Sequence, residues 1–278
     1  QEVLLENLKI IDEASKNKNK IVGIPTGFKE LDEKTSGLQR SDLIIVAARP
    51  AMGKTALALN IAQQSAVKAG SSVIILEMAK EQLGQRLLAM QARVEMQKLK
   101  QGDLERVDWD RISMAANDLN DTKIVIDDTP GISLMEMRNK CRRLKAEQGL
   151  DLVVVDYLQL MKFDGKADSR QQEISAISRN LKLLAREMDC PVIVLSQLSR
   201  APEQRPDKRP ILSDLRESGS IEQDADIVIF LYRDDYYNPD TETPGVCEIN
   251  IAKHRSGPTG KIELTWVSRY TKFSDKAL

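Results

Sequence analysis

Short, continuous apolar runs alternate with longer amphipathic segments from residue 43 to residue 196. The runs are apolar at successive positions and too short for helices, which is typical of strands buried on both faces. The predicted strands lie at residues 43–48, 73–76, 123–127, 152–156 and 191–196. One predicted helix lies at residues 53–69, and another follows the strand at 73–76 and runs to about residue 93. Two more lie at residues 133–148 and 170–188. This alternation predicts an α/β fold with helices on both faces of a mostly parallel sheet.

The pattern changes after residue 225. Three apolar stretches, at residues 227–232, 247–252 and 261–267, follow one another without helical segments between them. We therefore expect the central sheet to continue as an antiparallel extension toward the C-terminus.

The N-terminal residues have a pattern of their own. Apolar side chains recur at helical spacing over residues 1–15, which predicts an amphipathic helix. Residues 16–20 are polar and turn-prone, so we interpret them as a linker to a main domain at 21–278. The helix packs either on its own domain or on a neighbouring protomer, and the hydrophilic linker favours the neighbour.

The composition is that of a globular chain with a sizeable core, at 41% hydrophobic and 30% charged residues. Basic residues number 41 and acidic residues 42, and the net charge of −1 argues against a globally cationic nucleic-acid binder but permits a local basic strip. Three widely spaced cysteines fit a reducing compartment better than a disulfide framework. No apolar run approaches the roughly 18 residues that span a bilayer, and no signal peptide opens the chain. Because the sequence starts at Gln1, we expect a piece of a longer protein.

A phosphate-binding loop follows the first predicted strand. Residues 48–55 match the pattern G-x-x-x-x-G-K-[ST], except that Ala48 replaces the first glycine. Gly53 lets the backbone approach a phosphate, Lys54 brings positive charge to the β- and γ-phosphate oxygens, and the Thr55 hydroxyl binds Mg²⁺. The residues expected to bind nucleotide here are Ala51, Met52, Gly53, Lys54, Thr55 and Ala56. A strand before the motif and a helix after it make a chance match the weaker interpretation.

Acidic residues end two of the apolar runs. Asp156 follows residues 152–155, and Glu77 follows residues 73–76. In a parallel sheet both carboxylates lie at the carboxyl edge, where ligands bind in such folds. We expect Asp156 to hold Mg²⁺, directly or through water, and Glu77 to orient and deprotonate an attacking water. The alternative for each is a solvent-facing acid at a strand end, and the case for a functional role is stronger for Asp156.

Seven stretches carry a resemblance to a known family. They are residues 23–28, 48–55, 77–78, 155–159, 196–200, 214–223 and 253–258. Each is weak alone, but in this order they are specific, and the match runs from about residue 21 to 273. The chain resembles the motor domain of the DnaB-type replicative DNA helicases, a RecA-like family of ring ATPases. The resemblance implies a RecA-like P-loop NTPase fold and a homo-hexamer that hydrolyses ATP, with Mg²⁺, to move on single-stranded DNA and unwind duplex.

The resemblance also implies roles for individual residues. Glu77 is similar to the family's water-activating glutamate, and Gln197 to the residue at a strand end that senses the γ-phosphate. Lys253 and Arg255 resemble the pair that reaches the next subunit's nucleotide, with Arg255 as the arginine finger. Their alternative is a solvated basic turn. A primase and a helicase loader as partners, and a cytoplasmic place at a bacterial or phage replication fork, are likewise implied, and no membrane is.

The DNA-contacting segment is the hardest to read from the residues alone. Residues 199–216 hold five cations, three acids and three prolines, so composition alone favours a mixed-charge surface loop and no helix. The resemblance implies that Arg216 and the backbone at Glu217 and Gly219 hold single-strand phosphates on the inner rim of the ring. No aromatic residue lies within 164–229, so stacking partners for bases are scarce there. We therefore expect DNA binding that is insensitive to base sequence and sensitive to salt.

Two other functions share the phosphate-binding loop, Glu77 and Asp156. A recombinase-like or clock-type RecA relative forms filaments or rings but does not unwind duplex DNA. This alternative does not explain the stretches at 196–200 and 214–223. A non-enzymatic nucleotide-binding scaffold or loader has no need of a water-activating acid such as Glu77. Strand displacement on a forked duplex distinguishes the first from a helicase, and ATP turnover distinguishes the second.

Overall fold

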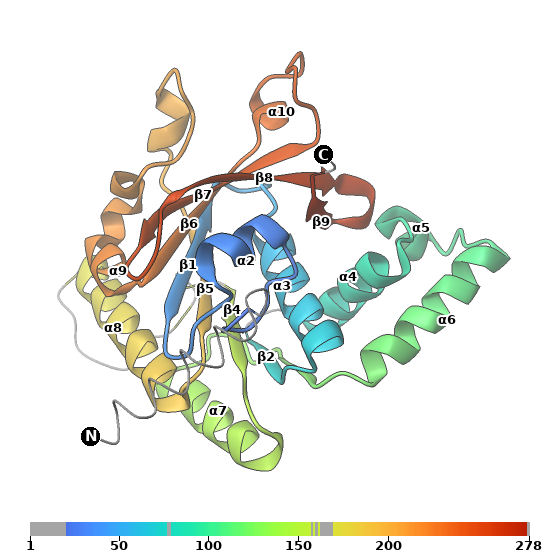
Figure 1. The fold of residues 1–278 in the computed structure, drawn as a ribbon, viewed down its shortest axis with the longest axis horizontal. Helices are drawn as coiled ribbons and strands as arrows, with labels where there is room; N and C mark the ends of the chain where they lie inside the picture. Colours follow the sequence, from blue (N-terminus) through green and yellow to red (C-terminus); the bar gives the residue numbers. More distant parts are fainter. Residues whose placement is uncertain (1–20, 77–78, 157, 159–160, 162–168, 277–278) are drawn as a thin grey trace.

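One mixed sheet runs through the part of the chain that the structure describes (Figure 1). The structure, a computed structural model, describes residues 21–76, 79–156, 158, 161 and 169–276, without the side chains of residues 216–219. The predicted helix over residues 1–15 and the linker at 16–20 lie outside the described residues, and so does Glu77.

The sheet has nine strands within the described residues, in the order β3-β2-β4-β5-β1-β6-β7-β8-β9. The strands are β1 (Leu43–Ala48), β2 (Val73–Leu76), β3 (Ile124–Asp127), β4 (Leu152–Val155), β5 (Val192–Gln197), β6 (Ile227–Tyr232), β7 (Val246–His254), β8 (Gly260–Val267) and β9 (Lys272–Asp275). β1 to β6 pair in parallel, whereas β6-β7-β8-β9 pair in antiparallel fashion. The predicted α/β class and mostly parallel sheet are confirmed. One detail is corrected: β6, expected to open the antiparallel extension, lies parallel to β1 and so completes the parallel part.

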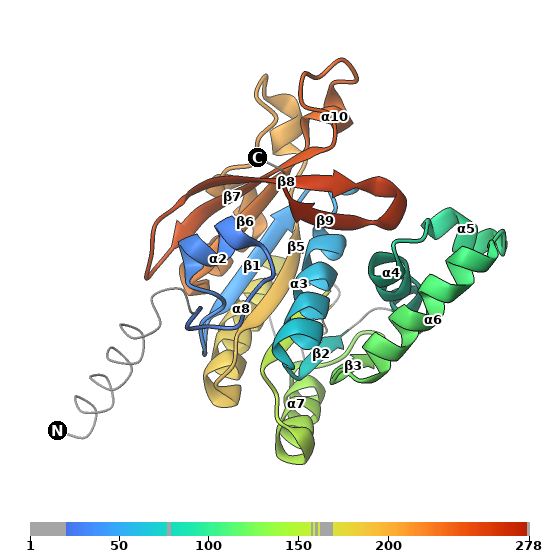
Figure 2. The same ribbon diagram turned by 45° about the vertical axis from the view of Figure 1, so that its right-hand side comes forward.

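Helices cover both faces of the sheet (Figures 1 and 2). They are α2 (Lys29–Thr35), α3 (Lys54–Ala69), α4 (Lys80–Ala92), α5 (Met96–Gln101), α6 (Arg106–Asn120), α7 (Leu134–Gln148), α8 (Arg170–Met188), α9 (Gly219–Asp224) and α10 (Asp234–Tyr237), with 3-10 helices η2 (Ala201–Gln204), η3 (Leu212–Ser218) and η4 (Ser268–Tyr270). One apolar core lies between the sheet and α2, α3 and α4, and it includes Phe273 of β9. A second lies between the opposite face and α7, α8 and α9. Each strand from β1 to β6 except β3 is buried along its length, apart from Gln197 at the end of β5, because side chains of successive residues enter the two cores in turn.

Five of the described helices and one strand have no counterpart in the sequence prediction, namely α2, α5, α6, α9, α10 and β9. Figure 2 shows α5 and α6 beside the sheet, next to α4 and away from the two main cores. They share with α4 a small cluster of their own around Ala92, Val94, Ile112 and Ala115. None of the described helices is long and apolar enough to cross a membrane.

Candidate active site

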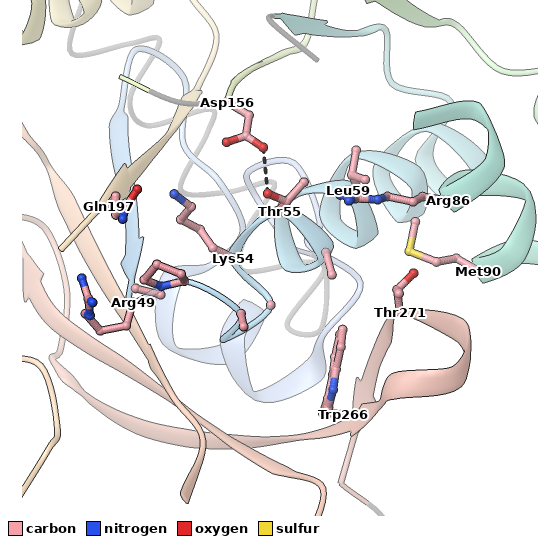
Figure 3. A pocket seen from close by; sticks show the side chains of 15 residues that line it. Arg49, Lys54, Thr55, Leu59, Arg86, Met90, Asp156, Gln197, Trp266 and Thr271 are labelled. Atoms are coloured by element: carbon pink, nitrogen blue, oxygen red, sulfur yellow. Dashed lines mark hydrogen bonds between the residues drawn. The ribbon is translucent and has the colours of Figure 1, made fainter. Parts of the chain in front are cut away.

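A cavity of about 420 Å³ opens at the carboxyl edge of the parallel strands (Figure 3). Its lining residues are Ala48, Arg49, Pro50, Ala51, Gly53, Lys54, Thr55, Ala56, Leu59, Arg86, Met90, Asp156, Gln197, Trp266 and Thr271. The predicted site residues among them are Ala51, Gly53, Lys54, Thr55, Ala56, Asp156 and Gln197. They meet because β1 and β5 lie side by side, with Ala48 paired to Gln197, and because β4 ends just before Asp156.

The phosphate-binding loop adopts the backbone that its glycine was predicted to permit. Gly53 is the N-cap of α3 with φ +97°, and a Cβ at this position would lie 2.8 Å from Cζ of Phe273. Ala51 also has a positive φ of 66°, and its carbonyl accepts a hydrogen bond from Arg233 at 3.4 Å. The loop therefore delivers the free N–H groups and positive dipole end of α3 to the cavity. The Met52 side chain is 1% exposed in the core and does not line the cavity, so its predicted part in nucleotide binding depends on its backbone.

Two oxygen-bearing side chains face each other at the start of α3. The Thr55 hydroxyl donates to Oδ2 of Asp156 at 2.7 Å, and Figure 3 shows both beside Lys54. Hydroxyl and carboxylate oxygens are the donors that Mg²⁺ prefers. Among the described residues, no three His, Cys, Asp or Glu side chains gather into a metal site. The two oxygens of Thr55 and Asp156 suit a hard cation such as Mg²⁺.

Lys54 is largely surrounded by protein. Burial lowers the pKa of its ammonium group, and the negative charge of Asp156 opposes that shift in part. A cation in such a place gains from an added anion, since its attraction to phosphate is screened less by water than at the surface. The geometry thus fits a triphosphate better than a neutral ligand.

The far wall of the cavity contains residues that the sequence interpretation missed. Arg86 and Met90 come from α4, while Trp266 and Thr271 come from the antiparallel end of the sheet (Figure 3). Trp266 packs against Phe273 with ring centroids 4.6 Å apart. These residues give the cavity an apolar and cationic wall suited to the non-phosphate part of a nucleotide. No local motif marks them, because they lie far from the phosphate-binding loop in the sequence.

Lys253 and Arg255 lie at the opposite edge of the sheet. Ile227, at the start of β6, pairs with His254 on one side and with Ile44 near the start of β1 on the other. The two cations therefore flank the amino ends of strands whose carboxyl ends border the cavity, and neither lines it. The Arg255 side chain is 46% exposed. Neither cation is placed to contact a ligand in the cavity of its own chain.

Residues 23–275 match the model of the family described as the DnaB-like helicase C terminal domain. The chain belongs to this DnaB-like family. It is 55% identical over 276 residues to the replicative DNA helicase DnaC of Bacillus subtilis (strain 168) and 54% identical to the replicative DNA helicase DnaB of Geobacillus stearothermophilus. In both cases the alignment covers 98% of this chain and 61% of the relative. The chain thus spans about three fifths of the length of these curated relatives.

Solved structures share the fold of this DnaB-like domain. One of them, described as an ATPase domain, superposes with a TM-score of 0.94 at 42% identity, and the match covers 99% of both chains. A DnaB-like replicative helicase, described with its interactions with primase, gives a TM-score of 0.92 at 43% identity over 97% of this chain and 66% of that one. The RecA-like P-loop fold expected from the sequence is confirmed by these neighbours.

The segment expected to contact DNA contains more regular structure than its composition suggested. The stretch at 199–216 contains the 3-10 helix η2 and most of η3, so the expectation of a loop is only partly right. Arg205 donates to both oxygens of Asp214, at 2.8 and 2.7 Å, and Arg209 pairs with Glu248. These two arginines are therefore held by acids of the same chain. The backbone of Arg216, Glu217 and Gly219 spans the junction of η3 and α9, and their side chains lie outside the described part.

A pair of acids near Arg255 makes stability depend on pH in this DnaB-like domain. Burial and the neighbouring charge of Asp226 raise the pKa of Asp42 from 3.8 to about 6, although Lys182 opposes the shift. The folded state thus binds more protons than the unfolded state between about pH 4 and pH 6, so stability falls as pH rises through this window.

Asp42→Asn removes the titrating group, so we expect the variant to lose this pH dependence. The change in the free energy of unfolding that the substitution causes should be more favourable at pH 8 than at pH 4 by about 1–3 kcal/mol. Urea unfolding at both pH values measures the difference. Asp240 is exposed, and Asp240→Asn is the matched control. It should change the free energy of unfolding by the same small amount at both pH values. Equal effects of Asp42→Asn at the two pH values would contradict the assignment.

Proposed function

We propose that the protein is the motor of a hexameric replicative DNA helicase, which hydrolyses ATP between subunits to move on single-stranded DNA and unwind duplex. One observation carries the proposal: the phosphate-binding loop lies at one edge of the sheet, whereas Lys253 and Arg255 lie at the other. A site divided in this way is complete only where two copies meet. Membership of the DnaB-like family supports the same conclusion.

The cavity holds ATP, with Mg²⁺ at Thr55 and Asp156. The backbone at Ala51, Met52, Gly53 and Ala56 surrounds the β-phosphate, and the Lys54 ammonium lies against the β- and γ-phosphate oxygens. Thr55 and Asp156 would hold the metal ion, which would supply positive charge beside the phosphates. Supporting evidence is the 2.7 Å approach of Thr55 to Asp156 and the burial that lowers the pKa of Lys54.

Hydrolysis needs a base for water and a sensor for the γ-phosphate. We assign the base to Glu77, which follows Leu76 at the end of β2, next to the β4 residue that precedes Asp156. Gln197 is the sensor, because it is the exposed end of β5 at the cavity wall and its amide both donates and accepts hydrogen bonds. The neighbouring subunit provides Lys253 and Arg255, whose charge stabilises the transition state.

DNA is gripped through its phosphates by Arg216 and by the backbone at Glu217 and Gly219. Arg205 and Arg209, which lie earlier in the same segment, are held by Asp214 and Glu248 of their own chain, so we assign the DNA contact to Arg216 and the backbone that follows it. Several subunits contacting one strand would add such weak contacts together. Binding should therefore weaken steeply with salt while remaining indifferent to base sequence.

The wider assignments rest on the family. We propose that residues 21–278 form the motor domain, that residues 16–20 link it to a helix over 1–15, and that this helix packs on an adjacent subunit. A primase and a helicase loader are proposed partners; a primase interaction is described for the structural neighbour. The replicative role in the names of the relatives supports a cytoplasmic place at the replication fork.

The particle mass with and without a non-hydrolysable ATP analogue tests the shared site. We expect a six-copy species that the analogue stabilises, ATP turnover stimulated by single-stranded DNA, and displacement of one strand from a forked duplex. Turnover and assembly without strand displacement would favour the recombinase-like alternative, and binding without turnover would favour a scaffold. A monomer that turns over ATP at full rate and ignores DNA would refute the proposal.

A further inference from the structure

Lys253 and Arg255 both bind carbonyl groups at the C-terminal end of α9. Lys253 Nζ donates to the carbonyl of Ala225 at 2.7 Å and to that of Glu222, and an Arg255 guanidinium nitrogen donates to the carbonyl of Gln223. The last carbonyls of a helix have no partner within it and carry partial negative charge, so cations stabilise this end. We call residues 222–226, which connect α9 to β6, the α9 exit turn.

The acceptors in the α9 exit turn are weak for such donors. A neutral carbonyl offers a cation only a dipole, whereas a phosphate oxygen offers a full negative charge and a stronger attraction. The carboxylate that pairs with Arg255 is Asp226, at 3.6 Å, and that carboxylate also accepts from Leu43 and Lys182. A triphosphate is a better acceptor for both cations. Their exchange from the turn to a nucleotide is therefore favourable wherever a neighbour presents one.

α9 begins at Gly219, within the segment proposed to hold DNA. On its other side it is tied to α8, where Ser178 donates to Asp224 at 2.8 Å and Ser220 contacts Ser175 at 2.7 Å. Ile221 is fully buried between them. The last helical hydrogen bond joins the Ala225 amide to the carbonyl of Ile221 at 2.9 Å. α9 is six residues long, so losing both cations would loosen its C-terminal end. The contacts with α8 would remain.

We propose that Lys253 and Arg255 form a latch on α9, and that binding the neighbour's triphosphate transfers both from the α9 exit turn to phosphate oxygens. The transfer loosens α9 and with it the DNA-contacting segment at its start. Nucleotide in one protomer thereby allows the DNA-contacting segment of the next protomer to change position. This inference rests on the proposed function, because it requires the two cations to act on a second copy.

Hydrogen–deuterium exchange of the Ala225 amide and of the peptide over residues 219–226 tests the latch in the assembled protein. Adding a non-hydrolysable ATP analogue should speed exchange there by about tenfold, the order expected when charge-assisted hydrogen bonds to a helix end are lost. Unchanged exchange at saturating analogue would overturn the latch.

Variants separate the latch from general loosening of α9. Lys253→Met should speed exchange before any nucleotide is added. The matched control, Ser178→Ala, removes the other tether and should speed exchange in both states while keeping the difference caused by the analogue. If Lys253→Met leaves nucleotide-free exchange unchanged while its thermal unfolding shows a folded protein, the latch is wrong.

A mixed assembly shows whether the effect crosses between copies. Isotope-labelled Lys54→Ala protomers, which should bind no nucleotide, are combined with unlabelled Arg255→Ala protomers, which should. The latch predicts faster exchange in the labelled α9 peptide when the analogue is added. If ATP turnover depends on Arg255 but this peptide does not respond, the latch fails and the proposed function stands. If turnover is independent of Arg255, both the latch and the proposed function fail.

Discussion

Arg255→Ala is expected to lower ATP turnover of the assembled protein by about 10³-fold or more, the usual contribution of an arginine finger. The residue lies at the amino edge of the sheet and does not line its own nucleotide cavity. The loss should therefore fall on the chemical step, while the affinity for a non-hydrolysable analogue changes little. Turnover at saturating ATP and analogue binding by calorimetry measure the two effects separately.

Two controls make the result specific to catalysis by a neighbour. Arg40→Ala removes an exposed arginine that pairs with Asp189 at the surface, and it should leave turnover unchanged. Mixing Arg255→Ala with Lys54→Ala protomers should restore part of the turnover, because some junctions then combine an intact loop with an intact arginine. Full turnover in Arg255→Ala, or no recovery in the mixture, would remove the assignment.

The sequence was sufficient for the parts of the fold that bury long apolar segments. β1, β2, β4 and β5 are apolar at successive positions because both faces of the sheet are covered, and this pattern is visible without a structure. The Gly53-Lys54-Thr55 motif was equally readable, because phosphate binding constrains neighbouring residues in one loop. Asp156 followed from the rule that strand ends in a parallel sheet meet at one edge.

The elements that were missed bury little. Within α6 the buried positions are Asp108, Ile112 and Ala115, because the helix packs on α4 and not on the sheet. β9 is four residues long, and Phe273 is its one buried side chain. Such elements are held by partners from elsewhere in the chain, which local periodicity cannot report.

The same reason explains the missing half of the cavity. Arg86, Trp266 and Thr271 approach the phosphate-binding loop only because α4 and the antiparallel strands pack around α3. Charge counting along residues 199–216 failed in a related way, since it could not show that Arg205 and Arg209 pair with acids inside the chain. Motifs thus predict the phosphate end of the site, whereas tertiary packing decides the rest.

Thr55→Val is expected to lower ATP turnover by about 10²-fold or more, since a displaced metal ion costs several kcal/mol of charge stabilisation. Valine keeps the shape of threonine but lacks the hydroxyl that contacts Asp156 at 2.7 Å. Asp156 is 7% exposed, so losing this partner also leaves a nearly buried carboxylate less satisfied, at a cost of about 1–3 kcal/mol of folding stability. Turnover against Mg²⁺ concentration, together with urea unfolding, measures both effects.

Thr55→Ser is the matched control, because it keeps the hydroxyl and removes only a methyl group. It should retain most of the turnover and the dependence on Mg²⁺. A second readout is the rise in melting temperature caused by Mg²⁺ with a non-hydrolysable analogue, which reports binding to the folded state alone. This rise should persist in Thr55→Ser and shrink in Thr55→Val. Equal turnover and equal stabilisation in the two variants would show that the Thr55 hydroxyl holds no metal ion, and Asp156 alone would then remain as its protein ligand.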